Sequence, residues 1–174
     1  MRVLLDRAGI DQALATLLDR ILDGTGGDVR LVGIQRGGVP LANRLADALE
    51  ARTGRRPQVG SLDITLYRDD LGAHPAPLVG PTRIDFPLEG KQVVLVDDVL
   101  STGRTVRAAL DEITDFGRPG RIWLAVLVDR QGRELPIQAD FVGAHFEAGP
   151  GESIEVALRE AGGDDQVVLV SRQK

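Results

Sequence analysis

The stretch that most constrains the fold is residues 91–110, which has the pattern of a strand, an acidic pair, a polar turn and a helix. It opens with Val93-Val94-Leu95-Val96, an apolar run of the length expected for a strand buried on both faces. Asp97 and Asp98 follow, where that strand is expected to end. After the turn, apolar residues recur with the period of an amphipathic helix, at Val106, Ala109, Leu110, Ile113 and Phe116. Such a unit is typical of an α/β domain.

The turn in this unit is suited to a phosphorylated sugar. The first amides of a helix that begins near Gly103 have no intrahelical partners, and the helix dipole adds positive charge there. The hydroxyls of Ser101, Thr102 and Thr105 are further donors, and a glycine lets the backbone approach closely. Because carboxylates repel a phosphate, we expect the two aspartates to bind sugar hydroxyls, with a phosphate-bound Mg²⁺ screening the repulsion.

Residues 93–105, V-V-L-V-D-D-V-L-S-T-G-R-T, resemble the phosphoribosyl pyrophosphate (PRPP) signature of type I phosphoribosyltransferases. The resemblance implies catalytic roles for Asp97 and Asp98, and a Mg²⁺ that is bound through PRPP and not by the protein alone. The alternative is an ordinary βα turn whose acids cap the helix. The implied PRPP-binding residues are Val96, Asp97, Asp98, Val99, Leu100, Ser101, Thr102, Gly103, Arg104 and Thr105.

A second strand–loop–helix unit precedes the first. A buried strand is predicted over 29–34 and a helix over 41–49, separated by Gln35, Arg36, Gly37 and Gly38. Two glycines permit a tight turn, and its amides with Arg36 could hold an anion, although such a loop is more often only a turn. Phosphoribosyltransferases hold pyrophosphate on a short loop at this position, so the resemblance implies a pyrophosphate loop over 35–38 with Arg36 catalytic.

A long breaker-rich segment follows the next predicted strand, over 57–66. Glycines and prolines from residue 72 to 81 exclude a regular element over most of it. A loop of this length is a lid or a surface insertion, and a lid would keep water from a reactive sugar carbon. The resemblance implies that this is the flexible loop, which contains Arg68, Asp69, Asp70 and Arg83.

Length and composition predict one soluble domain over residues 1–174. The chain has no cysteine, which excludes disulfides and thiolate metal sites, and no apolar run approaches the roughly 18 residues of a membrane span. We therefore expect no membrane partner and a cytoplasmic location. His74 and His145 have no helix-spaced partner for a metal. The net charge of −5 gives no general basic footprint for nucleic acid.

The remaining chain completes an open, mainly parallel sheet flanked by helices. A helix is predicted over 10–22, and a strand over 121–128 places Asp129 and Arg130 at the rim where ligands bind in such sheets. Short strands are predicted over 140–146 and 153–158, and an edge strand over 167–170. Residues 1–6 and 135–158 are expected to fold together as a small cap over the site, and Trp123 to pack in the core.

Three further stretches resemble the PyrR family: L-V-G-I-Q-R-G-G-V-P-L-A, L-D-I-T-L-Y-R-D-D-L and L-A-V-L-V-D-R-Q-G-R-E-L-P-I-Q-A-D-F-V-G. Members of this family are uracil phosphoribosyltransferases, which make UMP and pyrophosphate from uracil and PRPP, and they regulate the pyrimidine operon by transcription attenuation. The resemblance implies base contacts at Asp129, Arg130 and Ile154, and a homodimer or higher oligomer. It also implies UMP-dependent binding to leader mRNA.

Several departures from the family pattern bear on RNA binding. Residues 147–165 hold six acids against one base, Arg159, and Gln35 stands where threonine is common. Gln131-Gly132 likewise replaces the usual Gly-His. Two alternatives therefore stay open: an enzyme without RNA binding, and a phosphoribosyltransferase for another nucleobase. A local basic patch could still form from Arg104, Arg107, Arg118, Arg121, Arg130 and Arg133.

Overall fold

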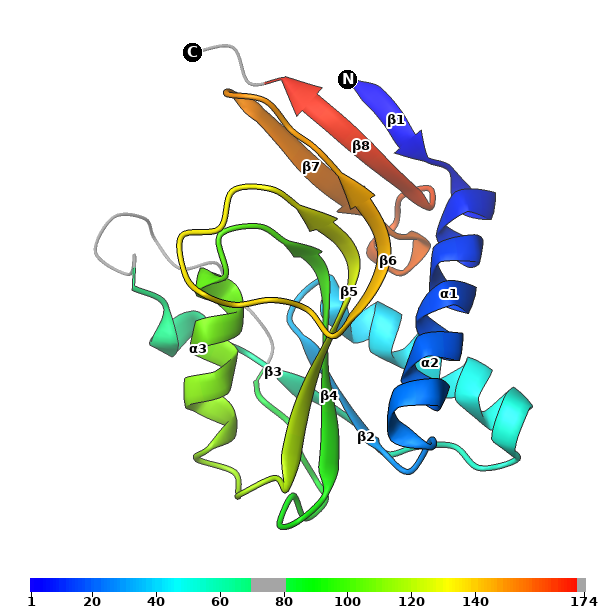
Figure 1. The fold of residues 1–174 in the computed structure, drawn as a ribbon, viewed down its shortest axis with the longest axis vertical. Coiled ribbons are helices and arrows are strands. Elements are labelled where there is room, and N and C mark those ends of the chain that lie inside the picture. Colours follow the sequence, from blue (N-terminus) through cyan, green and yellow to red (C-terminus); the bar gives the residue numbers. More distant parts are fainter. Residues whose placement is uncertain (70–80, 172–174) are drawn as a thin grey trace.

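The computed structural model describes residues 1–69 and 81–171, and its centre is a five-stranded sheet (Figure 1). The strand order is β3-β2-β4-β5-β6, and every neighbouring pair is parallel. This confirms the predicted open α/β fold. The strands are β2 (Arg30–Ile34), β3 (Val59–Leu62), β4 (Gln92–Leu100), β5 (Arg121–Arg130) and β6 (Phe141–Phe146).

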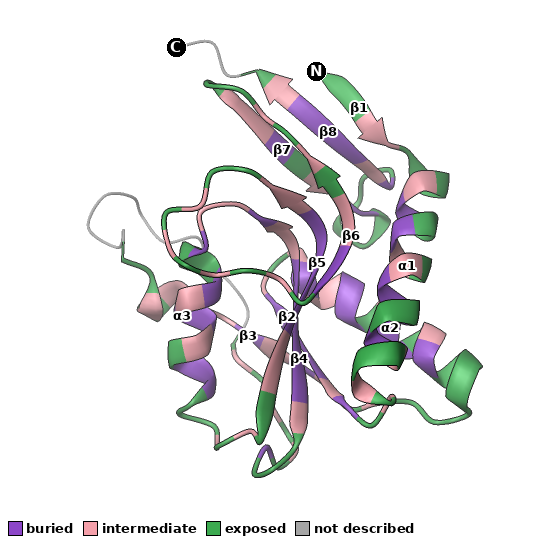
Figure 2. Ribbon diagram, viewed as in Figure 1, coloured by how far each residue is buried: buried purple, intermediate pink, exposed green. Residues whose placement is uncertain are grey.

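Helices cover both faces of this sheet, with α1 and α2 on one side and α3 on the other (Figure 1). Alternate residues of β4 account for this. Val94 and Val96 pack in the cluster that holds α1 and α2, whereas Val93 and Leu95 pack in the cluster that holds α3. All four are fully buried, and Figure 2 shows the buried residues concentrated along the sheet. The helices are α1 (Arg7–Thr25), α2 (Gly38–Thr53) and α3 (Arg104–Ile113).

A separate antiparallel sheet forms a cap beside the carboxyl ends of the central strands (Figure 1). It consists of β1 (Arg2–Leu5), β8 (Gln166–Ser171) and β7 (Glu152–Ala157), with β8 in the middle. The predicted edge position of β8 was therefore wrong: it pairs with the chain's first strand on one side and with β7 on the other, which buries Val167 completely.

The predicted cap, over residues 1–6 and 135–158, also included too much of the chain, because β6 belongs to the central sheet. The backbone N–H of Leu124 donates to the Asp140 carboxylate at 2.8 Å, and the N–H of Asp140 donates to the Leu124 carbonyl at 2.9 Å. These two bonds fix the start of β6 against β5. The cap thus takes its strands from residues 2–5, 152–157 and 166–171 only.

Three predicted element ends also differ in the structure. β4 continues through both aspartates to Leu100. β3 stops at Leu62, because the Asp63 carboxylate accepts bonds from the backbone and hydroxyl of Thr65 and turns the chain into a short 3-10 helix, η1 (Thr65–Tyr67). α3 ends at Ile113, since the next turn tightens through bonds between residues three apart, and this leaves Phe116 43% exposed. Trp123, predicted in the core, is only partly buried at its edge.

No helix within the described part of the chain is both long and apolar enough to cross a bilayer.

Candidate active site

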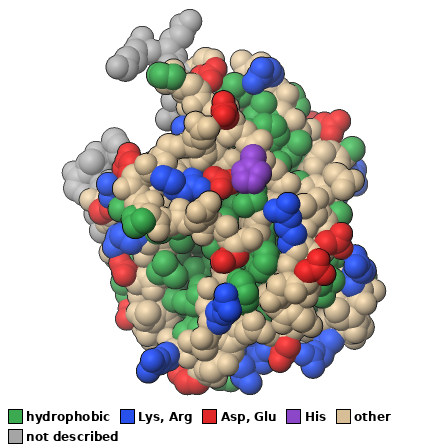
Figure 3. Space-filling view, in the orientation of Figure 1, with side chains coloured by type: hydrophobic (Ala, Val, Ile, Leu, Met, Phe, Trp, Pro, Cys, Tyr) green, Lys and Arg blue, Asp and Glu red, His purple; other side chains and the backbone are tan. Residues whose placement is uncertain are grey.

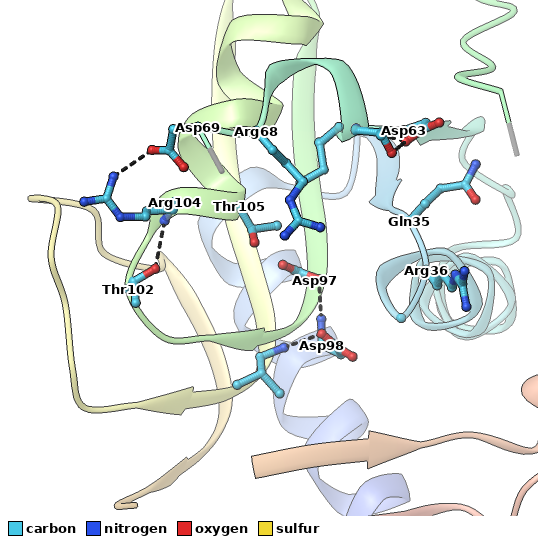
Figure 4. A pocket seen from close by; sticks show the side chains of 14 residues that line it. Gln35, Arg36, Asp63, Arg68, Asp69, Asp97, Asp98, Thr102, Arg104 and Thr105 are labelled. Carbon is cyan, nitrogen blue, oxygen red and sulfur yellow. Dashed lines mark hydrogen bonds and ion pairs between the residues drawn. The ribbon is translucent and has the colours of Figure 1, made fainter. Parts of the chain in front are cut away.

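A cavity of about 590 Å³ opens beyond the carboxyl ends of the central strands (Figure 4). It brings together three stretches that the sequence had singled out separately: the turn after β4, the turn after β2 and the start of the long segment after β3. Its lining residues are Gln35, Arg36, Gly37, Asp63, Ile64, Thr65, Arg68, Asp69, Asp97, Asp98, Val99, Thr102, Arg104 and Thr105.

Two adjacent carboxylates form the floor of this cavity. Asp97 is only 6% exposed, and its Oδ1 accepts the backbone N–H of Asp98 at 2.9 Å. Asp98 Oδ1 in turn accepts the N–H of Val99 at 2.7 Å. Burial and the neighbouring charge of Asp98 raise the pKa of Asp97 well above its usual value, and burial raises the pKa of Asp98. This pair therefore favours a ligand that brings hydroxyl donors or developing positive charge.

The turn between β4 and α3 leaves the helix N-terminus facing the cavity. Gly103, with a φ of 92°, is the N-cap and has no side chain to accept a bond from the helix. Of the first helical amides, that of Arg104 donates to Thr102 Oγ1 at 3.2 Å. Both residues line the cavity, as does Thr105, so the start of α3 contributes hydroxyls and the polar end of a helix to this wall, which favours an anion.

Some residues of the predicted PRPP motif do not line the cavity with their side chains. Val96 and Leu100 are 0% and 1% exposed and pack in the two core clusters, on either side of the lining residues Asp97, Asp98 and Val99. Ser101 and Gly103 lie in the turn itself and are not part of the lining. These four residues therefore belong to the motif through the course of their backbone, and their side chains do not line the cavity.

The turn after β2 packs directly against the aspartates. A Cβ on Gly37 would lie 2.1 Å from Asp98 Oδ2, and one on Gly38 would lie 2.1 Å from the Val96 carbonyl oxygen. The peptide bond between Gln35 and Arg36 is cis. Gln35, Arg36 and Gly37 line the cavity, and Arg36 is exposed, with no ion pair to an acid in the described ranges. The predicted pyrophosphate loop thus forms the opposite wall.

The segment after β3 supplies a wall that the sequence predicted only in part. Arg68 and Asp69 were expected there and line the cavity, and in Figure 4 the Arg68 side chain points toward Asp97. Asp63, Ile64 and Thr65 also line it but were missed. Their signal was the acid Asp63 at the end of a predicted strand: it directly follows β3, and Asp97 and Asp98 lie near the corresponding end of β4.

The other residues predicted in this loop lie elsewhere. Asp70 falls outside the described residues. Arg83 does not line the cavity: its backbone exchanges two hydrogen bonds with Ser61, of 2.8 and 2.9 Å, and so extends the edge of β3.

The predicted base contacts lie apart from this cavity. Asp129 and Arg130 line a neighbouring hollow of about 710 Å³, next to the turn because Leu100 of β4 and Asp129 of β5 are paired. Ile154 is 7% exposed, packs in the core and is not among the residues that line either space. The expected place of its segment near the base stays a prediction. The other lining residues of the hollow are Gln131, Gly132, Arg133, Gln138, His145, Phe146 and Glu147.

A protein-only metal site is not built into the described part of the chain: no three His, Cys, Asp or Glu side chains there are grouped to hold an ion. A Mg²⁺ at this site would depend on oxygens of the ligand, and the carboxylates that line the cavity are Asp63, Asp69, Asp97 and Asp98.

Comparison with known proteins identifies the family. Residues 4–152 match the family model described as "Phosphoribosyl transferase domain". The "Bifunctional protein PyrR" of Roseiflexus sp. (strain RS-1) is 55% identical over 171 residues, which cover 96% of this chain and 93% of that protein. That of Thermus thermophilus is 54% identical over 153 residues, covering 86% and 83%. The chain belongs to the PyrR family.

Solved structures agree with this PyrR chain on the fold. A hypoxanthine phosphoribosyltransferase of Trypanosoma cruzi has a TM-score of 0.73 at 19% identity, covering 99% of this chain and 98% of that one. A purine phosphoribosyltransferase from Pyrococcus horikoshii has a TM-score of 0.61 at 23% identity, covering 83% and 85%. At such identities, the likeness concerns the type I phosphoribosyltransferase architecture alone.

Proposed function

We propose that this PyrR-family chain is a uracil phosphoribosyltransferase, which converts uracil and PRPP into UMP and pyrophosphate. The observation that carries the proposal is the cavity in which the buried Asp97 and the half-buried Asp98 lie between the N-terminus of α3 and the turn after β2. This arrangement offers carboxylates to a ribose and donors to an anion on either side of it.

Each wall then has one task. The turn over 101–105 and the N-terminus of α3 bind the 5′-phosphate through backbone N–H groups and hydroxyls. Asp97 and Asp98 accept hydrogen bonds from the ribose hydroxyls. The loop over 35–38 and its exposed Arg36 bind the pyrophosphate.

Transfer proceeds through a sugar that carries positive charge at its anomeric carbon. The bond from that carbon to pyrophosphate breaks first, and pyrophosphate leaves with the electron pair. Uracil N1 then forms the new bond and its proton is released. Asp97 and Asp98 complement the transient charge, so catalysis consists of positioning and electrostatics and needs no covalent nucleophile. When bound with PRPP, Mg²⁺ supplies positive charge that makes pyrophosphate a better leaving group.

The uracil ring is proposed to lie on the side of Asp129 and Arg130, which face the hollow adjacent to the PRPP turn. These two residues lie one strand further along the sheet than the aspartate pair. A base placed there reaches the anomeric carbon from the side opposite the loop over 35–38, because β5 and β2 flank β4.

A second function is proposed from the family: UMP-dependent regulation of the pyrimidine operon through binding of leader mRNA, by a homodimer or higher oligomer in the cytoplasm. The relatives are named bifunctional, which supports it. An enzyme that has lost RNA binding is the alternative, because residues 147–165 are acidic.

The test is an assay with PRPP, Mg²⁺ and each nucleobase in turn, following pyrophosphate and nucleotide. We expect turnover with uracil only, and a loss of at least about a hundredfold in kcat/KM for Asp98→Asn. The matched control, Asp23→Asn, changes an exposed acid on α1 and should retain full activity. Turnover only with a purine would reject uracil, and an Asp98→Asn enzyme with unchanged kinetics would reject the assigned roles.

A further inference from the structure

Arg133 makes an unusual set of contacts in the segment that follows β5. Its Nε donates to the Ile137 carbonyl at 2.8 Å, and its Nη1 donates to the carbonyls of Ser101 at 2.8 Å and Arg130 at 2.9 Å. Its Nη2 donates to Asp129 Oδ1 at 2.6 Å. One guanidinium therefore bonds four groups, and the side chain is 26% exposed.

One end of this set lies under the phosphate turn. Besides the Ser101 carbonyl, the carbonyl of Thr102 accepts the backbone N–H groups of Glu134 at 3.0 Å and Leu135 at 3.2 Å. A Cβ on Gly103 would meet that of Ile137 at 3.3 Å, so the turn rests directly on the segment 133–137. All these bonds use carbonyl oxygens of the turn, so they do not compete with a phosphate for its N–H groups.

The other end lies at the rim proposed to face the base. Asp129 is 12% exposed at its side chain and lines the second hollow, and its ion pair with Arg133 fixes one carboxylate oxygen. The same guanidinium holds the carbonyl of Arg130, the other proposed base residue. The phosphate turn and the base-facing rim are thus joined through one side chain.

We propose that Arg133 is a positioning residue that sets the phosphate turn and the base-facing rim in register for phosphoribosyl transfer. The inference rests on the proposed function. The reacting atoms lie between a bound phosphate and a bound base, so both ends must be held at once for the anomeric carbon and the attacking nitrogen to meet. The four bonds of the Arg133 guanidinium all go to protein groups, so its proposed effect is exerted through Ser101 and Asp129.

A lysine cannot replace this residue. Arginine has a planar fork of five N–H donors, whereas an ammonium is a point charge with three. Lysine at 133 would keep the charge opposite Asp129 but would leave carbonyls of the turn or the rim without their donor. The chain offers a matched control in Arg118→Lys, since Arg118 is an exposed residue at the other end of β5.

The experiment measures kcat and both KM values for wild type, Arg133→Lys and Arg118→Lys, together with the affinities for UMP and ribose 5-phosphate. We expect Arg133→Lys to raise the KM of PRPP and of uracil together, each by about tenfold, with Arg118→Lys unchanged. UMP spans turn and rim, so its affinity should fall more than that of ribose 5-phosphate, which reaches the turn alone. Guanidinium ion added to Arg133→Ala should restore part of the affinity for UMP.

The outcomes separate this inference from the proposed activity. A wild-type protein without turnover rejects the proposed activity. An active wild type whose Arg133→Lys variant has a lower Tm but unchanged KM values overturns the positioning role. Should that variant not fold, Asp129→Asn decides: the role requires that this base-side change also weakens PRPP, and an unaltered KM for PRPP overturns it.

Discussion

Burying two neighbouring carboxylates costs this protein stability, at the residues that serve its proposed chemistry. Asp97 has its pKa raised by burial and by the charge of Asp98. A carboxyl whose pKa is higher in the folded state holds its proton more tightly there, so stability falls as the pH rises from the unfolded pKa to the raised one. Above the raised pKa the full penalty remains, at about 1.4 kcal/mol per pKa unit.

Asp97→Asn should therefore stabilise the free protein while it abolishes turnover. The asparagine Oδ1 can still accept the N–H of Asp98, and no buried charge has to form. We expect a higher Tm than wild type at pH 8, and a difference that shrinks toward pH 4, because a lower pH favours the uncharged form of the buried carboxyl. Thermal denaturation across this pH range measures it. If the Tm of Asp97→Asn relative to that of wild type were lower at pH 8 than at pH 4, the predicted direction of the effect would be wrong.

Gly37 and Gly38 both allow close packing, but we expect Gly37 to be needed for activity and Gly38 for stability. At Gly37 an added Cβ would meet the Asp98 carboxylate, which is a side chain that can turn away, whereas at Gly38 it would meet the Val96 carbonyl, which is backbone of β4. Gly37→Ala should then displace Asp98 and lower kcat/KM by at least about tenfold with little change in Tm. Gly38→Ala should lower stability by about 2 kcal/mol or more.

Activity and thermal denaturation of both variants check this difference. Gly163→Ala is the matched control, because its Cβ would meet only Ala157 Cβ at an ordinary 3.6 Å. Equal Tm losses in Gly37→Ala and Gly38→Ala would show that both positions serve packing alone.

At the scale of elements, α3 has a second task beside presenting its N-terminus. Arg107 donates to the Tyr67 carbonyl at 2.6 Å, and Arg104 pairs with Asp69 at 2.6 Å, which holds the chain just before residue 70. Further along the helix, buried Glu112 accepts the hydroxyl of Thr82, which itself accepts the N–H of Asp63 at 2.8 Å. The helix that is proposed to bind the 5′-phosphate thus also fixes both described flanks of residues 70–80.

Besides apolar packing, ion pairs of one arginine of α2 join the cap to the core. Arg44 donates to both oxygens of Asp165, at 2.8 and 3.1 Å, and pairs with Glu160 at 2.6 Å. The Asp165 side chain is 2% exposed, and Arg44 lowers its pKa. A lowered pKa contributes stability above the unfolded value, near 3.9, that is lost as the pH falls through the folded value.

Asp165→Asn should accordingly destabilise the protein at pH 7, by about 2 kcal/mol, since it leaves the half-buried guanidinium with fewer charged partners. The loss should shrink below pH 4. Chemical denaturation at both pH values measures it. Asp28→Asn is the control: Asp28 pairs with Arg30 and Arg55 but is 70% exposed, so its removal should change stability by less than about 0.5 kcal/mol. Equal losses at the two sites would show that the cap is not held by this pair.

Local sequence pattern predicted where the helices and strands lie better than it predicted which strands pair with each other. Four consecutive apolar residues identified β4, and Gly103 identified the start of α3, because both signals lie within a few residues. The middle position of β8 depends on pairing with β1, at the far end of the chain, which no local pattern encodes. Asp63 was missed for a similar reason: it joins the site only because β3 pairs in parallel with β2, which in turn pairs in parallel with β4.

At the scale of the whole molecule, the distribution of basic side chains bears on the proposed binding of RNA. The six arginines considered for a basic patch do not form one. Arg104, Arg107 and Arg133 are paired with acids, and Arg121 lies over the ring of Trp123, 3.7 Å from its centroid. Arg118 and Arg121 are separated from Arg130 by the length of β5, roughly 30 Å. Figure 3 shows basic and acidic side chains interspersed on the face it presents, without a continuous basic area.

This distribution predicts a shallow salt dependence for any binding to pyrimidine-operon leader RNA. Each phosphate neutralised adds about 0.7 to the slope of log affinity against log salt for single strands. Within the described ranges only three of the six arginines have no acid partner, so affinity should fall by less than about thirtyfold between 50 and 200 mM salt, whereas six to ten phosphate contacts would cost about a few hundredfold or more. Gel-shift titrations at both salt concentrations, with and without UMP, measure the slope. A loss above a hundredfold would mean that oligomer formation assembles a basic surface that a single chain lacks, and no binding at either salt would favour the enzyme-only alternative.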